Sequence, residues 1–140
     1  MALTVGNVNS SAMKIYTGVT PTAITCLVDT EIDLTMDMRD ITCKDDGETA
    51  NKLPGLTSWS MTFSGMFAFD ATNGWSAMFT IWKNRTKTGV VWQNGNTGDK
   101  KYAGDAYITN LKGSAQGTNQ STTFSGTWDG VGALTESTIS

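Results

Sequence analysis

The longest alternation of apolar and polar positions lies at Thr57–Phe69, where the chain reads TSWSMTFSGMFAF. Alternation with a period of two predicts a β-strand with one buried face. At about 3.3 Å per residue this strand would span roughly 40 Å, more than a typical strand. One face of this strand is rich in serine and threonine. The opposite face is expected to pack in a core and carries Trp59, Met61, Phe63, Phe67 and Phe69.

A second alternation covers Ala23–Asp40 and predicts one strand, or two strands with a turn near Asp29. One face is apolar and carries Ile32, Leu34, Met36 and Met38. The other face carries an acidic row, defined as Asp29, Glu31, Asp33 and Asp37. Side chains on one face of a strand stand roughly 6.5–7 Å apart, too far for several to enclose one metal ion. The row is therefore either a solvated outer face or the lining of a surface that repels anions.

Residues 73–85 predict the α-helix of the chain. Asn73 is a candidate N-cap, and Gly89 lies beyond the predicted end. Large apolar residues recur at i, i+3, i+4 and i+7, which is the spacing of an amphipathic helix. This helix stripe is expected to pack against a sheet and comprises Trp75, Met78, Phe79 and Trp82.

The rest of the chain divides into shorter strands, a long loop and two polar ends. Strands are predicted at Val90–Gln93, Lys101–Leu111 and Thr118–Trp128, with a turn at residues 94–99. Residues 1–20, with a short strand at Met13–Tyr16, and residues 131–140 are predicted as arms of a single 140-residue domain.

Residues 44–56 contain Asp-Gly and Pro-Gly and predict a loop. A connection of this length is commonly functional or mobile. We interpret it either as a functional contact or as a plain mobile loop. The residues expected to make the contact are Lys44, Asp45, Asp46, Glu48, Asn51, Lys52 and Leu53.

The composition supports an all-β domain without catalytic chemistry. Charged residues make up only 16% of the chain, and the net charge of −3 argues against a basic nucleic-acid-binding patch. The chain contains no histidine, which removes histidine-based triads and histidine metal ligands. We therefore predict a protein that is not an enzyme and that uses no metal or cofactor.

The beginning of the chain, MALTVGNVNSSAMKIY, shows no secretory pattern, and no apolar run approaches the length of a membrane span. We expect a chain that is not exported and has no membrane partner. Under that expectation, Cys26 and Cys43 are predicted to be buried free thiols, with a disulfide as the alternative.

Three passages together resemble the major tail tube proteins of long-tailed bacteriophages. They are KLPGLTSWSMTFSGMF with the helix that follows it, YAGDAYITNLKGSA, and TTFSGTWDGVGALT. The resemblance extends from about Thr42 onward. The order of loop, strand, helix, hairpin and strand is more specific than any single passage.

This resemblance implies a fold and a function. The implied fold is mainly β, with two packed antiparallel sheets forming a small β-barrel or sandwich and one flanking helix. The implied function is that of a structural virion protein, assembled in the bacterial host cytoplasm, whose hexameric rings stack into a tail tube. Implied partners are further copies of the chain, a tape measure protein and tail terminator or tip proteins. DNA would pass through the lumen without specific binding.

On this interpretation the acidic row is predicted to line the lumen. The loop at residues 44–56 is predicted to contact a neighbouring subunit or ring, and the serine- and threonine-rich face of the long strand to meet solvent or a neighbouring subunit. The same fold also forms the inner tubes of contractile injection and secretion systems, so that function remains an alternative. A further alternative is a monomeric β-sandwich binding module of the carbohydrate-binding type, for which the five tryptophans would supply the aromatic residues.

Overall fold

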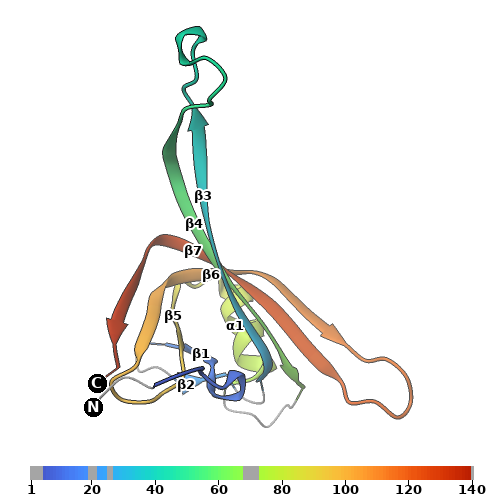
Figure 1. Cartoon of the computed structure of the whole chain (residues 1–140). Helices are drawn as coiled ribbons and strands as arrows, with labels where there is room; N and C mark the ends of the chain where they lie inside the picture. Colours follow the sequence, from blue (N-terminus) through green and yellow to red (C-terminus); the bar gives the residue numbers. More distant parts are fainter. Residues whose placement is uncertain (1–4, 19–21, 25–26, 68–72, 140) are drawn as a thin grey trace.

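The computed structural model describes residues 5–18, 22–24, 27–67 and 73–139, except for the side chains of Ser10 and Asp46. It is a mainly β domain with one α-helix (Figure 1). The elements, in chain order, are η1 (Ser10–Ala12), β1 (Lys14–Thr17), β2 (Thr22–Ala23), β3 (Leu27–Asp40), η2 (Lys44–Asp46), β4 (Lys52–Met66), α1 (Trp75–Asn84), β5 (Thr88–Gln93), β6 (Lys100–Ser114) and β7 (Thr123–Thr138).

The seven strands of the described residues form one antiparallel sheet in the order β2-β1-β5-β6-β7-β4-β3. The sheet curls, so that β5 and β3 meet across the core. The indole Nε1 of Trp92 donates to Thr30 Oγ1 at 3.2 Å, and that hydroxyl donates to the carbonyl of Met13 at 3.1 Å. The predicted class, mainly β with one flanking helix, is confirmed. The two predicted sheets are one continuous sheet, however, and it does not close into a barrel.

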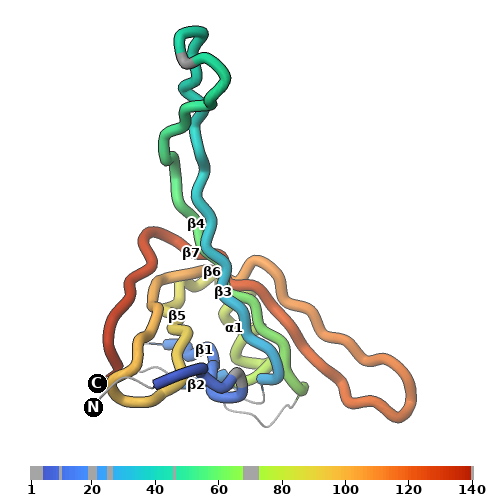
Figure 2. The backbone as a smooth tube through the Cα atoms, in the orientation of Figure 1, coloured from blue at the N-terminus to red at the C-terminus, as the bar shows by residue number. Residues whose placement is uncertain are grey.

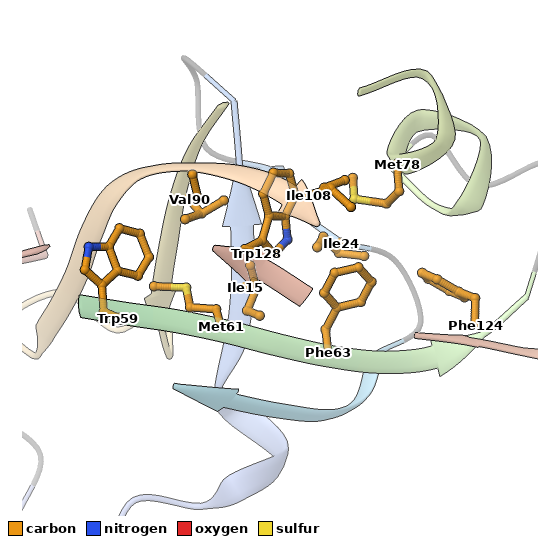
Figure 3. Packing of buried hydrophobic residues seen from close by; sticks show 11 residues of the cluster. Ile15, Ile24, Trp59, Met61, Phe63, Met78, Val90, Ile108, Phe124 and Trp128 are labelled. Atoms are coloured by element: carbon orange, nitrogen blue, oxygen red, sulfur yellow. The ribbon is translucent and has the colours of Figure 1, made fainter. Parts of the chain in front are cut away.

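The hydrophobic core lies inside this curl, where side chains from both halves of the sheet meet Met78 of α1 (Figure 3). Phe63 of β4 and Phe124 of β7 pack edge to face with ring centroids 5.8 Å apart. Trp128 of β7 is fully buried at the centre, and its indole N–H has no hydrogen-bond partner within the described residues. The other buried members of the core are Ile15, Ile24, Trp59, Met61, Val90, Ala106 and Ile108.

The alternation predicted for β4 is confirmed over its second half. The buried positions are Trp59, Met61, Phe63 and Gly65. The strand starts at Lys52 and ends at Met66, so both predicted boundaries shift toward the N-terminus. Phe67 follows the strand and is half-buried, and Phe69 lies outside the described residues.

β3 and β4 continue past the core as a long hairpin that rises away from the body (Figures 1 and 2). The predicted loop at residues 44–56 was therefore too long, because residues 52–56 belong to β4. Pro54 is tolerated there because β4 has only β3 as a neighbour at this level. Gly55 lies opposite Asp37 at a break in register, where a Cβ atom would come within 3.1 Å of the Asp37 carbonyl oxygen.

The predicted C-terminal arm at residues 131–140 is also a correction. β7 continues to Thr138 and pairs with the first residues of β6. A bulge obscures the alternation in the sequence, because residues 132–134 lie opposite Gly104 and Gly132 has a φ of 77°. The same strand begins at Thr123 rather than at the predicted Thr118.

The helix is confirmed at Trp75–Asn84, but Asn73 is not its cap. Gly74 is the N-cap residue, and the Asn73 side chain instead donates to Thr17 Oγ1 and to the Thr22 carbonyl, both at 2.9 Å. This amide therefore ties the start of α1 to β1 and β2. No helix in the described part of the chain is long and apolar enough to cross a membrane.

The helix stripe is only partly buried. Met78 is fully buried, and Trp75 is half-buried with its ring centroid 5.1 Å from that of Phe67. Phe79 and Trp82 are 43% and 48% exposed, and their ring centroids are 6.0 Å apart. α1 packs along β6, and that contact leaves these two members of the predicted stripe about half exposed.

Candidate assembly surface

Four long strands, β3, β4, β7 and β6, form a section of the sheet with one polar face. Residues directly opposite each other on neighbouring strands point to the same face. The strand registers define three rows across this section, and we call the surface that they form the polar face. The rows are Asp29–Ser64–Ser125–Lys112, Glu31–Thr62–Thr127–Asn110 and Asp33–Ser60–Asp129–Tyr107.

The acidic row lies on one face of β3, as its alternation predicted, and all four carboxylates are exposed. Three of them belong to the polar face, and Asp37 continues the row into the hairpin. Hydroxyl groups on β4 lie beside two of them: Thr62 Oγ1 donates to Glu31 Oε2 at 3.4 Å, and Ser64 Oγ donates to Asp29 Oδ2 at 3.5 Å. The serine- and threonine-rich face of β4 therefore lies beside a row of carboxylates.

The charges on the polar face are unequal. Its three rows hold four carboxylates, from the acidic row and Asp129, against the single ammonium group of Lys112. Such a surface repels polyanions when copies of it are brought together. Among the described residues, no group of three or more histidine, cysteine or acidic side chains could hold a metal ion.

Among the described residues, no strand pairs with either outer side of this four-stranded section at the level of the three rows. β3 is the last strand of the sheet and pairs only with β4. At the other side, β5 pairs with β6 only as far as Ala106, so Tyr107–Ser114 pairs with β7 alone. Unpaired backbone N–H and C=O groups on long strand edges are a template for another strand.

The hairpin carries apolar side chains that nothing in the described chain covers. The apolar face of β3 leaves the core near Leu34, which is 62% exposed, and Leu56 on β4 is 82% exposed. The other large apolar side chains exposed along the hairpin are Met36, Met38, Ile41 and Leu53. By the strand register Met36 and Met38 lie on one face of the hairpin, and Leu53, opposite Arg39, lies on the other. Exposed apolar side chains gathered on one element indicate an interaction site.

The tip of the hairpin has a defined structure of its own. Ile41 N donates to the Asn51 carbonyl at 2.9 Å, and Asn51 N donates to Thr42 Oγ1 at 2.8 Å. The side-chain and backbone hydrogen bonds from Thr42 lower the pKa of Asp40, which is fully exposed. Hydrogen bonds therefore hold the base of the loop before any partner is present.

The predicted contact residues are spread over this tip. Lys44 and Asp45 lie in η2, Glu48 and Asn51 lie in the loop, and Lys52 and Leu53 begin β4. The side chain of Asp46 lies outside the described residues.

The prediction of buried thiols is wrong for Cys43, which is exposed in the loop at the hairpin tip. Cys26 lies outside the described residues, so that part of the prediction stays open.

Sequence reasoning missed the two charged residues that β6 and β7 bring to the polar face, Asp129 and Lys112. Each lies one residue beyond the end of a predicted strand. The sequence does not say which strands are neighbours in the sheet. Only the order β6-β7-β4-β3 brings these side chains onto one surface with the acidic row. The alternation within each strand indicates which of its faces is polar. The pairing of the strands combines these faces into one polar surface.

A mainly β domain with one helix, an acidic sheet face and two open strand edges has the architecture of a structural protein that forms tubes. The chain belongs to the phage tail tube protein family, whose sequence model matches residues 12–136. No curated protein matches the chain.

Solved structures of similar fold come from several kinds of tail. A chain in the tail of an empty gene transfer agent particle, refined with C6 symmetry, has a TM-score of 0.81 at 20% identity, over 94% of this chain and 99% of that chain. The SPP1 tail tube has a TM-score of 0.72 at 15% identity, over 96% and 81%. A sheath–tube complex of an extracellular contractile injection system, PVC, has a TM-score of 0.65 at 12% identity, over 91% and 88%.

Proposed function

We propose that six copies of this tail tube protein join side by side into a ring and that the rings stack into a tube that conducts DNA. The sixfold number is taken from the symmetry of the similar gene transfer agent tail. The observation that carries the proposal is the pair of open edges on a four-stranded section whose exposed face is polar and acidic. This function requires no catalytic residue, metal or cofactor.

The direction of the strands supports closure through these edges. Neighbouring strands in the section β3-β4-β7-β6 are antiparallel. Because the number of strands is even, β6 of one copy would meet β3 of the next in the antiparallel direction. The alternation would then continue across every seam, and neither edge of the four-stranded section would stay exposed to unwanted pairing.

The size of such a ring suits a DNA duplex. Six sections of four strands make a barrel of about 24 strands. With about 4.8 Å between strands and a tilt near 40°, the backbone diameter is roughly 50 Å. Side chains reduce this width but still leave room for a duplex.

We assign the polar face, with the acidic row, to the lumen. Lysine-rich walls would hold DNA through counterion release from its phosphates, whereas carboxylates repel phosphates and leave the duplex free to slide. The apolar hairpin would contact the next ring, where its side chains lose their exposure to water. We also propose a virion location, with tape measure and terminator or tip proteins as partners.

A second candidate is the inner tube of a contractile injection system. The similarity to the PVC sheath–tube complex supports this candidate at the level of the fold. The exposed Phe79–Trp82 pair on α1 would then be available to an outer sheath.

The positions of the tryptophans weigh against a carbohydrate-binding module. Such a module needs exposed aromatic faces, but Trp59 and Trp128 are buried and Trp75 and Trp92 are half-buried. Trp82 is left as the exposed tryptophan of the described chain, which is too little for an aromatic binding platform.

The proposal is tested by purifying the full chain and observing it over a range of concentrations by sedimentation velocity and negative-stain electron microscopy. Sixfold rings and hollow tubes are the expected result. A chain that remains a monomer at high concentration and low salt would overturn the proposal. A cryo-EM reconstruction of the tubes that placed the acidic row on the outer wall would overturn the assignment of the lumen.

A further inference from the structure

Lys112 and the acidic row lie at opposite sides of the polar face. Lys112 is on the open edge of β6, and its row continues through Ser125 and Ser64 to Asp29 on the open edge of β3. Three strand intervals of about 4.8 Å separate the two ends of this row, so they do not contact each other within one chain. Lys112 is exposed, and within the described residues it forms no ion pair. Each copy thus offers a cation at one edge and a row of anions at the other.

We infer that Lys112 of one copy pairs with Asp33 of the adjacent copy, and that this ion pair selects the seam between β6 and β3. The inference rests on the proposed ring and names the residues that hold it together. It commits to a second copy of this chain as the partner, because the two open edges carry complementary charge.

The geometry of a closed barrel brings these two residues together. Strands in a barrel tilt by about 35–45°, and for four strands about 4.8 Å apart this requires a stagger of about four to six residues per copy. The shift must be even, because an odd shift would turn the polar face to the other side. A shift of four carries Lys112 from the level of Asp29 to that of Asp33. A shift of six carries it to Thr35, between Asp33 and Asp37 and within reach of both.

A stagger in the opposite sense is disfavoured by the lengths of the strands. It would carry Lys112 beyond Leu27, the first residue of β3, and would set at most half of the segment Tyr107–Ser114 opposite that strand. The favourable sense pairs the whole segment Tyr107–Ser114 with β3 of the neighbouring copy.

The charges also discriminate against wrong pairings of the same edges. Two β3 edges brought together would place one acidic row against another, and like charges directly opposite each other on a sheet are destabilising. Two β6 edges would bring two copies of Lys112 together. Only the β6–β3 seam pairs opposite charges, and this seam is also the only one that repeats around a ring.

Charge reversal tests the ion pair on the purified full chain. We expect Lys112→Glu to raise the concentration needed for ring formation by about ten-fold or more at low salt. Adding Asp33→Lys to the same chain should restore assembly, whereas Asp33→Lys alone should impair it. Lys87→Glu makes the same change of charge at an exposed position outside the polar face and serves as the control. Tryptophan fluorescence checks that every variant is folded.

Disulfide trapping tests the register independently. In a background with Cys26→Ala and Cys43→Ala that still assembles, Lys112→Cys is combined with Asp33→Cys or with Thr35→Cys. Residues directly opposite each other across a seam are close enough for a disulfide, so oxidation should produce a ladder of covalent oligomers with one of these combinations. The combination of Lys112→Cys with Asp29→Cys uses the same strands and the same face but the wrong level, and it should produce no ladder.

The outcomes separate this inference from the proposed ring. Rings that form equally well with Lys112→Glu and with Lys87→Glu, and that give no ladder, would overturn the ion pair while leaving the ring intact. If the combination of Lys112→Cys with Asp29→Cys produced a ladder and the other two combinations did not, the stagger would be overturned. A wild-type chain that forms no oligomer at all would overturn both proposals.

Discussion

The indole ring of Trp59 on β4 lies directly against the backbone of Gly130 on β7, so a Cβ atom at that glycine would overlap the ring. Gly104 on β6 lies against the six-membered ring of the same indole, and Trp59 Nε1 donates to the Gly132 carbonyl at 3.1 Å. This contact holds the point where β4 turns upward into the hairpin and β7 turns away with β6. One tryptophan therefore joins the body of the domain to both of its diverging ends.

The contact predicts that Gly130→Ala destabilises the chain. The added methyl group would force the indole out of its site, and overpacking of this kind costs about 1–3 kcal/mol of the free energy of unfolding. Urea denaturation followed by tryptophan fluorescence measures the change. Gly89→Ala on β5 is the matched control, because the nearest atoms to its Cβ position are 3.8 Å away. Equal free energies of unfolding for the two variants would show that the Trp59 ring can move to accommodate the added methyl group without loss of stability.

The uneven burial of the helix stripe predicts two different responses to truncation. Met78→Ala should lower the free energy of unfolding by about 2–4 kcal/mol, because it leaves a cavity in a fully buried site. Phe79→Ala should cost less than about 1 kcal/mol in the unassembled chain, because the ring is 43% exposed. Thermal unfolding of both variants at low protein concentration provides the comparison. A loss for Phe79→Ala as large as that for Met78→Ala would mean that the ring is covered.

Tyr102 is expected to titrate above its ordinary range. Its hydroxyl donates to Glu136 Oε2 at 2.7 Å, and this hydrogen bond, followed by desolvation and the carboxylate charge, raises the pKa of Tyr102 above its usual value of 10.0. Because the folded state holds the phenolic proton more tightly than the unfolded state does, the stabilisation is complete below pH 10 and is lost as the pH rises through the raised pKa.

Ultraviolet absorbance of the tyrosinate measures this titration. Glu136→Ala removes the acceptor and should return Tyr102 toward its ordinary pKa. Glu48→Ala removes an exposed carboxylate in the hairpin loop and should leave the titration of Tyr102 unchanged. The hydrogen bond is refuted if both variants titrate like the wild type.

The exposed hairpin predicts that stacking can be lost without loss of ring closure. Leu56→Asp places a charge on an apolar side chain that is 82% exposed, so the unassembled chain should keep its stability within about 0.5 kcal/mol. If the hairpin is buried between rings, the buried charge should prevent long tubes while single rings persist. Electron microscopy distinguishes the two species, and Leu56→Ile is the conservative control. Tubes of normal length with Leu56→Asp would place the hairpin outside the contact.

The acidic row predicts how tubes interact with DNA. Glu31→Lys together with Asp129→Lys reverses two charges on the polar face without touching Lys112 or Asp33. If this face lines the lumen, tubes assembled in the presence of DNA should retain it at low salt and release it as the salt concentration rises. Wild-type tubes should retain none. Nuclease protection measures the retained DNA, and absence of retention in the variant would argue against a lumenal polar face.

The alternation of single strands could be predicted from the sequence where nothing interrupts it. The apolar face of β4 around Met61 and the acidic face of β3 follow directly from period two, because both strands border the core on one side only. The C-terminal half of β7 was missed for the opposite reason. Gly132 introduces a bulge that breaks the period, and the small residues around it resemble a flexible tail.

The candidate surface depends on information that one strand does not carry. Lys112 becomes part of the polar face only because β6 pairs with β7, and β7 with β4, in a particular register. The exposure of Phe79 likewise depends on how much of the stripe the sheet covers, which its spacing in the sequence does not encode. Residue propensity and hydrophobic period predict the individual strands and the helix. The order of the strands in the sheet decides which side chains lie together on one surface.

The hairpin of β3 and β4 projects from one end of the molecule, and β1 and the end of β7 lie toward the other end of the body (Figure 1). If the hairpin of one ring contacts the opposite end of the next ring, the contact is head-to-tail, and stacking can continue without limit. Such a contact does not set the number of rings in a tube. Filaments grown from this protein alone should therefore vary widely in length, and a fixed length would require a separate molecular ruler.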